Sequence, residues 1–117
     1  MEMTKIYLPN QRQPLNLDNF SVQDLARFTI MKMRAEAVES SIKANLIYGQ
    51  WMVGQSDANR AALQPLLQKT MQTAEVVMRS PALESEADDK QFADAIECHS
   101  EALRFFYSKL EEYRKPN

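Results

Sequence analysis

Hydrophobic side chains recur through residues 21–53 in two separate rows with helical spacing. One row advances in alternating steps of three and four residues and comprises Phe28, Met31, Ala35, Val38, Ile42, Asn45, Gly49 and Met52. The other row has the same spacing on another face and comprises Ile30, Met33, Ala37, Ser40, Ala44, Ile47 and Trp51. This spacing is typical of a helix that packs lengthwise on another helix. The pattern predicts a long helix that is central in its domain or shared with a second chain.

The start of this helix is marked by several agreeing residues. Ser21 is a favourable N-cap, and Asp24 follows it at the position of a capping-box acid. Phe20 and Leu25 have the spacing of a hydrophobic staple. We therefore expect the first helix to cover residues 22–53.

The two glycines of the chain lie near the end of this helix. The apolar pattern continues past Gly49, so this residue is expected inside the helix, where it admits a closely packed neighbour or allows a local kink. A turn-forming segment follows Gly54, which is the position of a left-handed residue that closes a helix.

Two further helices are predicted at residues 57–79 and 89–114. Pro65 lies inside the second, which is either kinked at this residue or split by it. A continuous apolar stripe favours the kinked helix, and its members are Leu63, Leu67, Met71, Ala74 and Met78. The third helix carries a clean heptad of Phe92, Ile96, His99, Leu103, Phe106, Leu110 and Tyr113.

Residues 1–20 are predicted to form an extended arm. Pro9 and Pro14 oppose helix formation, and Ile6 and Leu8 alternate with polar residues. The expected fold is therefore all-α: a small antiparallel bundle of three main helices in residues 21–117, preceded by the arm.

Composition agrees with a single domain. The chain has 117 residues, of which 44% are hydrophobic, and this length suits one ordinary domain. It has no apolar run long enough for a membrane span and no segment typical of a secretory signal. Cys98 is the only cysteine, which fits a reducing compartment, so we expect a cytoplasmic protein with no membrane partner.

Catalytic chemistry is not indicated. Cys98 and His99 are adjacent in a helix and point about 100° apart, so they do not form a thiol–imidazole pair. We expect His99 to be a core or interface residue, with pH sensing as an alternative. The acidic residues of 84–89 match no calcium loop and suit a helix N-terminus. We expect no enzyme activity, cofactor or metal.

Basic residues provide one further candidate site. The net charge is −2, and a small basic patch is formed by Arg12, Arg27, Lys32 and Arg34. Such a patch is a weak candidate for phosphate binding, and nucleic acid is a disfavoured partner because the C-terminal third is acidic.

The surplus of apolar helix surface indicates a non-enzymatic protein–protein interaction module, such as an adaptor, a chaperone-like protein or an inhibitor. We expect it to form a homodimer through the long helix and to bind a protein partner. The candidate interface residues are Ile6, Leu8, Ile30, Met33, Ala37, Ala44, Ile47, Gly49 and Trp51. Two alternatives are a regulator that binds nucleic acid and a bundle that binds a small apolar ligand near Trp51.

Overall fold

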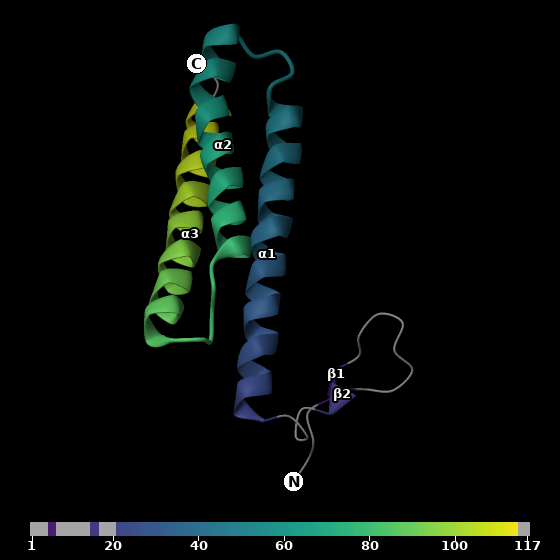
Figure 1. Cartoon of the computed structure of the whole chain (residues 1–117). Coiled ribbons are helices and arrows are strands. Elements are labelled where there is room, and N and C mark those ends of the chain that lie inside the picture. Colours follow the sequence, from purple (N-terminus) through teal and green to yellow (C-terminus); the bar gives the residue numbers. More distant parts are fainter. Residues whose placement is uncertain (1–4, 7–14, 17–20, 115–117) are drawn as a thin grey trace. The chain divides into compact units, whose positions relative to one another are not determined.

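A computed structural model describes residues 5–6, 15–16 and 21–114 of the chain. Its elements are two short strands, β1 (Lys5–Ile6) and β2 (Leu15–Asn16), and three helices, α1 (Val22–Trp51), α2 (Asp57–Arg79) and α3 (Glu86–Arg114) (Figure 1). The predicted all-α class and three-helix bundle are confirmed.

The chain divides into two compact units, Met1–Lys32 and Met33–Asn117, with the boundary inside α1. In the first unit, β1 and β2 pair antiparallel, with Lys5 opposite Asn16 and Ile6 opposite Leu15. The second unit holds residues 33–51 of α1 together with α2 and α3.

Contacts between α1 and α2 fix their relative direction within the second unit. The hydroxyl of Tyr48 donates a hydrogen bond to the carbonyl of Arg60 at 3.2 Å. Near the other end of α2, Arg34 Nη2 donates to the carbonyl of Ser80 at 2.7 Å. Residue numbers rise along one helix as they fall along the other, so α1 and α2 are antiparallel.

Serine side chains cap all three helices at their N-termini. Ser21 Oγ accepts from the Asp24 backbone N–H at 3.1 Å, and Asp24 Oδ2 accepts from Ser21 N–H at 3.3 Å. This reciprocal pair confirms the predicted start of α1. Ser56 and Ser85 each accept from the N–H three residues on. The Ser85 cap explains why α3 starts at Glu86, three residues before the predicted start.

The C-terminal end of α1 tests the predictions made for Gly49 and Gly54. The helix ends at Trp51 rather than at residue 53. Gly54 has a φ of 82°, which confirms the predicted left-handed residue. Gly49 is exposed, and a Cβ built on it would meet nothing within 4 Å. The expected close approach of a neighbouring helix at Gly49 is therefore wrong within this chain.

Helix α2 is continuous through Pro65, so the alternative of two separate pieces is wrong. Pro65 is exposed, and its ring therefore faces away from the other helices. The helix is retained because its buried residues continue on both sides of the proline: Leu63, Leu67, Thr70, Thr73, Ala74 and Val77.

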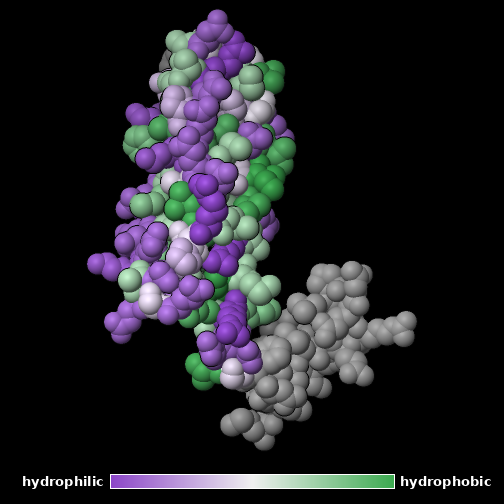
Figure 2. Space-filling view, in the orientation of Figure 1, coloured by the Kyte–Doolittle hydropathy of each residue, from purple (hydrophilic) through white to green (hydrophobic). Residues whose placement is uncertain are grey.

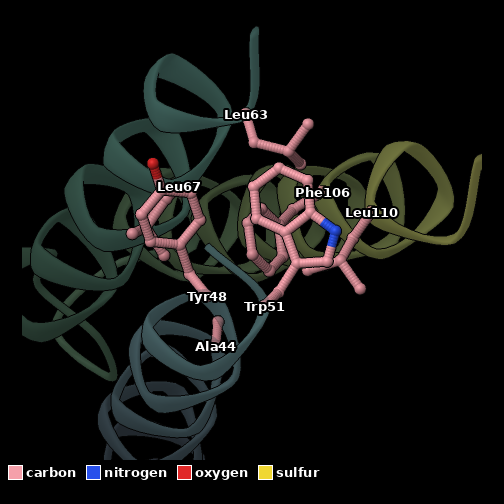
Figure 3. Packing of buried hydrophobic residues seen from close by; sticks show 7 residues of the cluster. All are labelled: Ala44, Tyr48, Trp51, Leu63, Leu67, Phe106 and Leu110. Carbon is pink, nitrogen blue, oxygen red and sulfur yellow. The ribbon is translucent and has the colours of Figure 1, made fainter. Parts of the chain in front are cut away.

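The largest apolar cluster joins all three helices (Figure 3). Its members are Ala44, Tyr48 and Trp51 from α1, Leu63 and Leu67 from α2, and Phe106 and Leu110 from α3. The Tyr48 and Trp51 rings lie 5.7 Å apart between centroids, a separation at which aromatic rings attract each other. Residues of the second apolar row of α1 thus form the intramolecular core.

Candidate interaction surface

Burial in this core corrects part of the predicted interface. Ala37, Ala44 and Trp51 are all less than a tenth exposed within the bundle. Their side chains already contact the bundle interior, so these three residues are not available to a partner. Met33 and Ile47 are half-buried, and Ile47 packs against the core cluster.

The other predicted interface residues are dispersed. Ile6 belongs to β1, but its side chain and all of Leu8 lie outside the described residues. Ile30 is half-buried and belongs to the unit Met1–Lys32. Gly49 is exposed on α1. Of the predicted interface residues in the unit Met33–Asn117, only Gly49 is exposed.

Large apolar side chains are instead exposed on the other row of α1, at Leu46 next to this row, and on α2. Ile42 is 56% exposed and Leu46 63% exposed. On α2, Met71 is 47% exposed and Met78 45% exposed. Hydrophobic surface lies along the side of the bundle where α1 runs (Figure 2). Contiguous exposed apolar surface of this kind is typical of an interaction site.

Two hollows line the junction of α1 and α2. One has a volume of about 590 Å³ and is lined by Val38, Ser41, Gln68, Met71, Gln72, Ala74, Glu75 and Met78. The other has a volume of about 650 Å³ and is lined by Asn45, Leu46, Tyr48, Gly49, Gln50, Met52, Gln64, Leu67, Gln68 and Met71. Gln68 and Met71 line both hollows, which are therefore adjacent, and we call the two together the α1/α2 groove.

The α1/α2 groove combines methionine and aliphatic walls with an edge of uncharged amides. Met71 and Met78 have flexible, polarisable side chains that adapt to differently shaped partners. Gln64, Gln68 and Gln72 supply hydrogen-bond donors and acceptors without the desolvation cost of a full charge. Glu75 adds one carboxylate to this lining.

The sequence interpretation placed Met71 and Met78 in the core stripe of α2. The structure buries Thr70, Thr73 and Val77 in their place. Both threonine hydroxyls donate to backbone carbonyls of their own helix at 2.9–3.0 Å. This internal bonding removes the cost of burying the hydroxyl groups. The helical spacing of the β-branched residues Thr70, Thr73 and Val77 was the sequence signal that could have identified this buried face.

His99 joins the three helices away from the groove. It is 4% exposed, and its Nδ1 lies 3.1 Å from Thr73 Oγ1 on α2. Its Nε2 lies 3.0 Å from Ser40 Oγ on α1. The expectation that His99 is a core residue is confirmed. A neutral imidazole has one N–H, so the tautomer of the ring decides which of the two hydroxyls accepts from it.

Burial lowers the pKa of His99 from its usual value of 6.5, because the charged imidazolium is poorly solvated there. The backbone carbonyls of Thr70 and Ala37 act in the opposite direction. Cys98 is exposed, whereas its neighbour His99 is buried, so the thiol and the imidazole lie on different sides of α3.

The residues of the candidate basic patch are divided between the two units. Arg12 lies outside the described residues. Arg27 and Lys32 are exposed in the first unit, where Arg27 lies 3.9 Å from a carboxylate oxygen of Asp24. Arg34 has a structural role: it donates to the Ser80 carbonyl, and its Cζ lies 5.6 Å from the centre of the Phe92 ring. These contacts direct part of the Arg34 guanidinium into the bundle, and its role in phosphate binding stays a prediction.

The acidic residues before and within α3 also have local roles. Asp89 Oδ1 accepts a hydrogen bond from the Leu83 backbone N–H at 2.6 Å. Three acids occupy the first turn of α3, where the helix dipole stabilises them. Among the described residues, no group of three or more His, Cys, Asp or Glu side chains is placed to hold a metal ion.

None of the helices within residues 21–114 is both long and apolar enough to cross a membrane. Comparison of the chain with protein-family models, curated proteins and solved structures finds no match.

Proposed function

We propose that this protein is a non-enzymatic protein-interaction module that binds an apolar helix along the α1/α2 groove. The proposal includes the broad roles of adaptor, chaperone-like protein and inhibitor, and a cytoplasmic location consistent with a single cysteine. The observation that carries it is the exposure of Leu46, Met71 and Met78 in the lining of the α1/α2 groove.

The spacing of the exposed side of α1 indicates the shape of the occupant. Val38, Ile42, Asn45, Gly49 and Met52 advance in alternating steps of four and three residues. A helix that lies along such a row inserts its side chains between successive members. An amphipathic helix therefore matches the groove better than an extended peptide or a small compound.

Photo-crosslinking inside cells tests this proposal. A photoreactive amino acid at Leu46 should give covalent adducts with a protein, whether another chain or a second copy. The matched control places it at Arg104, which is exposed on α3 and lines neither hollow of the groove. Absence of adducts at Leu46, or the same adducts at both positions, would contradict the proposed function.

A further inference from the structure

We propose that Ser40 is a nucleophilic serine that takes up an acyl group from an activated ester, with His99 as its general base. Neither residue lines the α1/α2 groove, so this site goes beyond the proposed function. Ser40 Oγ lies 3.0 Å from His99 Nε2, and the other ring nitrogen lies 3.1 Å from Thr73 Oγ1. A hydroxyl, an imidazole and a third group that orients the ring are the arrangement that activates a serine.

The hydrogen bonds of the two hydroxyls favour the tautomer that this chemistry needs. The Thr73 hydroxyl donates to two carbonyls of its own helix, each at 2.9 Å, whereas Ser40 has the Ala37 carbonyl at 3.0 Å. Because the Thr73 proton is shared between two acceptors, the Thr73 oxygen accepts from the Nδ1–H of His99. The Nε2 atom then carries no proton and accepts from the Ser40 hydroxyl.

The surroundings of His99 suit a general base. Its side chain is buried, and burial lowers its pKa from 6.5, so the ring is mostly neutral near neutral pH and is able to accept a proton. The carboxylate of Glu36 lines the same hollow as His99. Its negative charge favours the imidazolium that forms when the Ser40 proton is transferred.

A hollow between α1 and α3 gives a substrate access to Ser40. It has a volume of about 270 Å³, and Met33, Ile96 and Leu103 contribute apolar walls to it. This volume is at the lower end of the range for ligand sites, so it suits a short acyl chain. The carboxylate of Glu36 in the same lining disfavours an anionic acyl group. The substrate class is therefore an ester of a short, uncharged carboxylic acid.

The reaction transfers the acyl group to Ser40 and releases an alcohol. Ser40 Oγ forms a bond to the acyl carbon while its proton passes to His99 Nε2, and the bond from that carbon to the leaving oxygen then breaks. The leaving oxygen takes the proton from His99. Helices α1 and α3 are continuous around the hollow, so their backbone N–H groups bond within the helices and form no oxyanion hole there. We therefore expect one acylation of Ser40 by an ester with a good leaving group, without rapid turnover.

Treatment of the full chain with para-nitrophenyl acetate tests the site. We expect release of para-nitrophenol and an acetyl ester on Ser40, which peptide mapping by mass spectrometry distinguishes from products on lysines and on the exposed Cys98. Ser100 lines the same hollow and is the internal control. Ser40 should be acetylated about a hundredfold faster than Ser100, as expected for a hydroxyl with a general base. Acetylation of Ser40 no faster than that of Ser100 would overturn the proposal.

Variants test the two neighbours of the nucleophile. His99→Gln removes the base and should slow the acetylation of Ser40 about a hundredfold. Thr73→Val removes the hydroxyl that orients the ring, and it should slow acetylation and shift the nitrogen NMR signals of His99. Thr73→Ser keeps a hydroxyl and should preserve both.

Urea unfolding identifies the variants that are folded and can be compared. An unchanged acetylation rate in folded His99→Gln would contradict the role of the imidazole. If that variant does not fold, the comparison of Ser40 with Ser100 in the unaltered chain decides.

Discussion

The imidazole of His99 lies 3.1 Å from the hydroxyl of Thr73, on a helix 26 residues earlier in the chain. The same ring lies 3.0 Å from the hydroxyl of Ser40, which is 59 residues away. One side chain thus connects α3 to both other helices. Because the His99 side chain is buried and titratable, we expect the stability of the bundle to depend on pH.

We expect stability to fall as the pH drops below about 6.5. The folded-state pKa of His99 is lowered from 6.5, so the unfolded chain binds the proton more readily. The free energy of unfolding is therefore highest above the pKa that His99 has in the unfolded chain. It decreases as the pH falls towards the pKa of His99 in the folded chain. The urea midpoint should drop between mildly alkaline and mildly acidic buffer.

The His99→Gln variant should lose most of this pH dependence, since it has no group that titrates in this range. Glu36 lines the same hollow as His99, so Glu36→Gln serves as the control and should keep the dependence. Because His99 is the only histidine, its imidazole NMR signals report its pKa directly. A measured pKa at or above 6.5 would contradict this account.

The two glycines should respond oppositely to alanine. Gly49 is helical, and a Cβ there meets nothing within 4 Å. Gly49→Ala should therefore stabilise the bundle by about 1 kcal/mol through helix propensity. Gly54 has a positive φ, so Gly54→Ala should destabilise by about 1–2 kcal/mol. Thermal unfolding of both variants checks this pair, and a loss of stability in the Gly49 variant would argue against the described environment.

Adjacent phenylalanines on α3 provide a second matched pair. Phe106 is 0% exposed and Phe105 is 54% exposed. Phe106→Ala removes a side chain from the centre of the core and should cost about 3–5 kcal/mol. Phe105→Ala should cost under about 0.5 kcal/mol, as expected for a surface substitution. Similar urea midpoints for the two variants would show that the predicted face of α3 is not the buried one.

Arg34 should matter for stability more than other arginines. Its guanidinium bonds the Ser80 carbonyl and stacks on Phe92, and a hydrogen bond from a charged donor contributes about 1.5–3 kcal/mol. Arg34→Ala should lower the free energy of unfolding by about that amount. Arg104→Ala, on the exposed side of α3, should have little effect. If Arg34→Ala leaves stability unchanged but abolishes binding to an anionic partner, the structural role is wrong.

Local signals in the sequence were sufficient to predict the positions of the three helices. Ser21 and Asp24 marked the start of α1, and Gly54 marked its end, because caps and turns depend on residues close together in the chain. The heptad of α3 identified Phe106 and Leu110 as core residues for the same reason. These interactions do not require knowledge of the tertiary fold.

The choice between the two rows of α1 required tertiary information. Both rows have the same periodicity, so periodicity alone cannot distinguish them. The buried row contains Ala37 and Ala44, whereas the exposed row carries Ile42 and Met31. The burial of Ala37, Ala44 and Trp51 within the bundle could therefore not be predicted from the sequence. The connection of His99 to Ser40 likewise depends on how distant helices align.

The position of Trp51 affects how this protein is best studied by fluorescence. It is the only tryptophan, it is 7% exposed, and its Nε1 has no hydrogen-bond partner among the described residues. Its ring lies against Tyr48 and 6.3 Å from the Tyr113 ring, and it does not line the α1/α2 groove. Intrinsic emission will therefore report unfolding of the bundle clearly, yet stay nearly constant when the groove is occupied. A binding assay needs a dye attached near the groove.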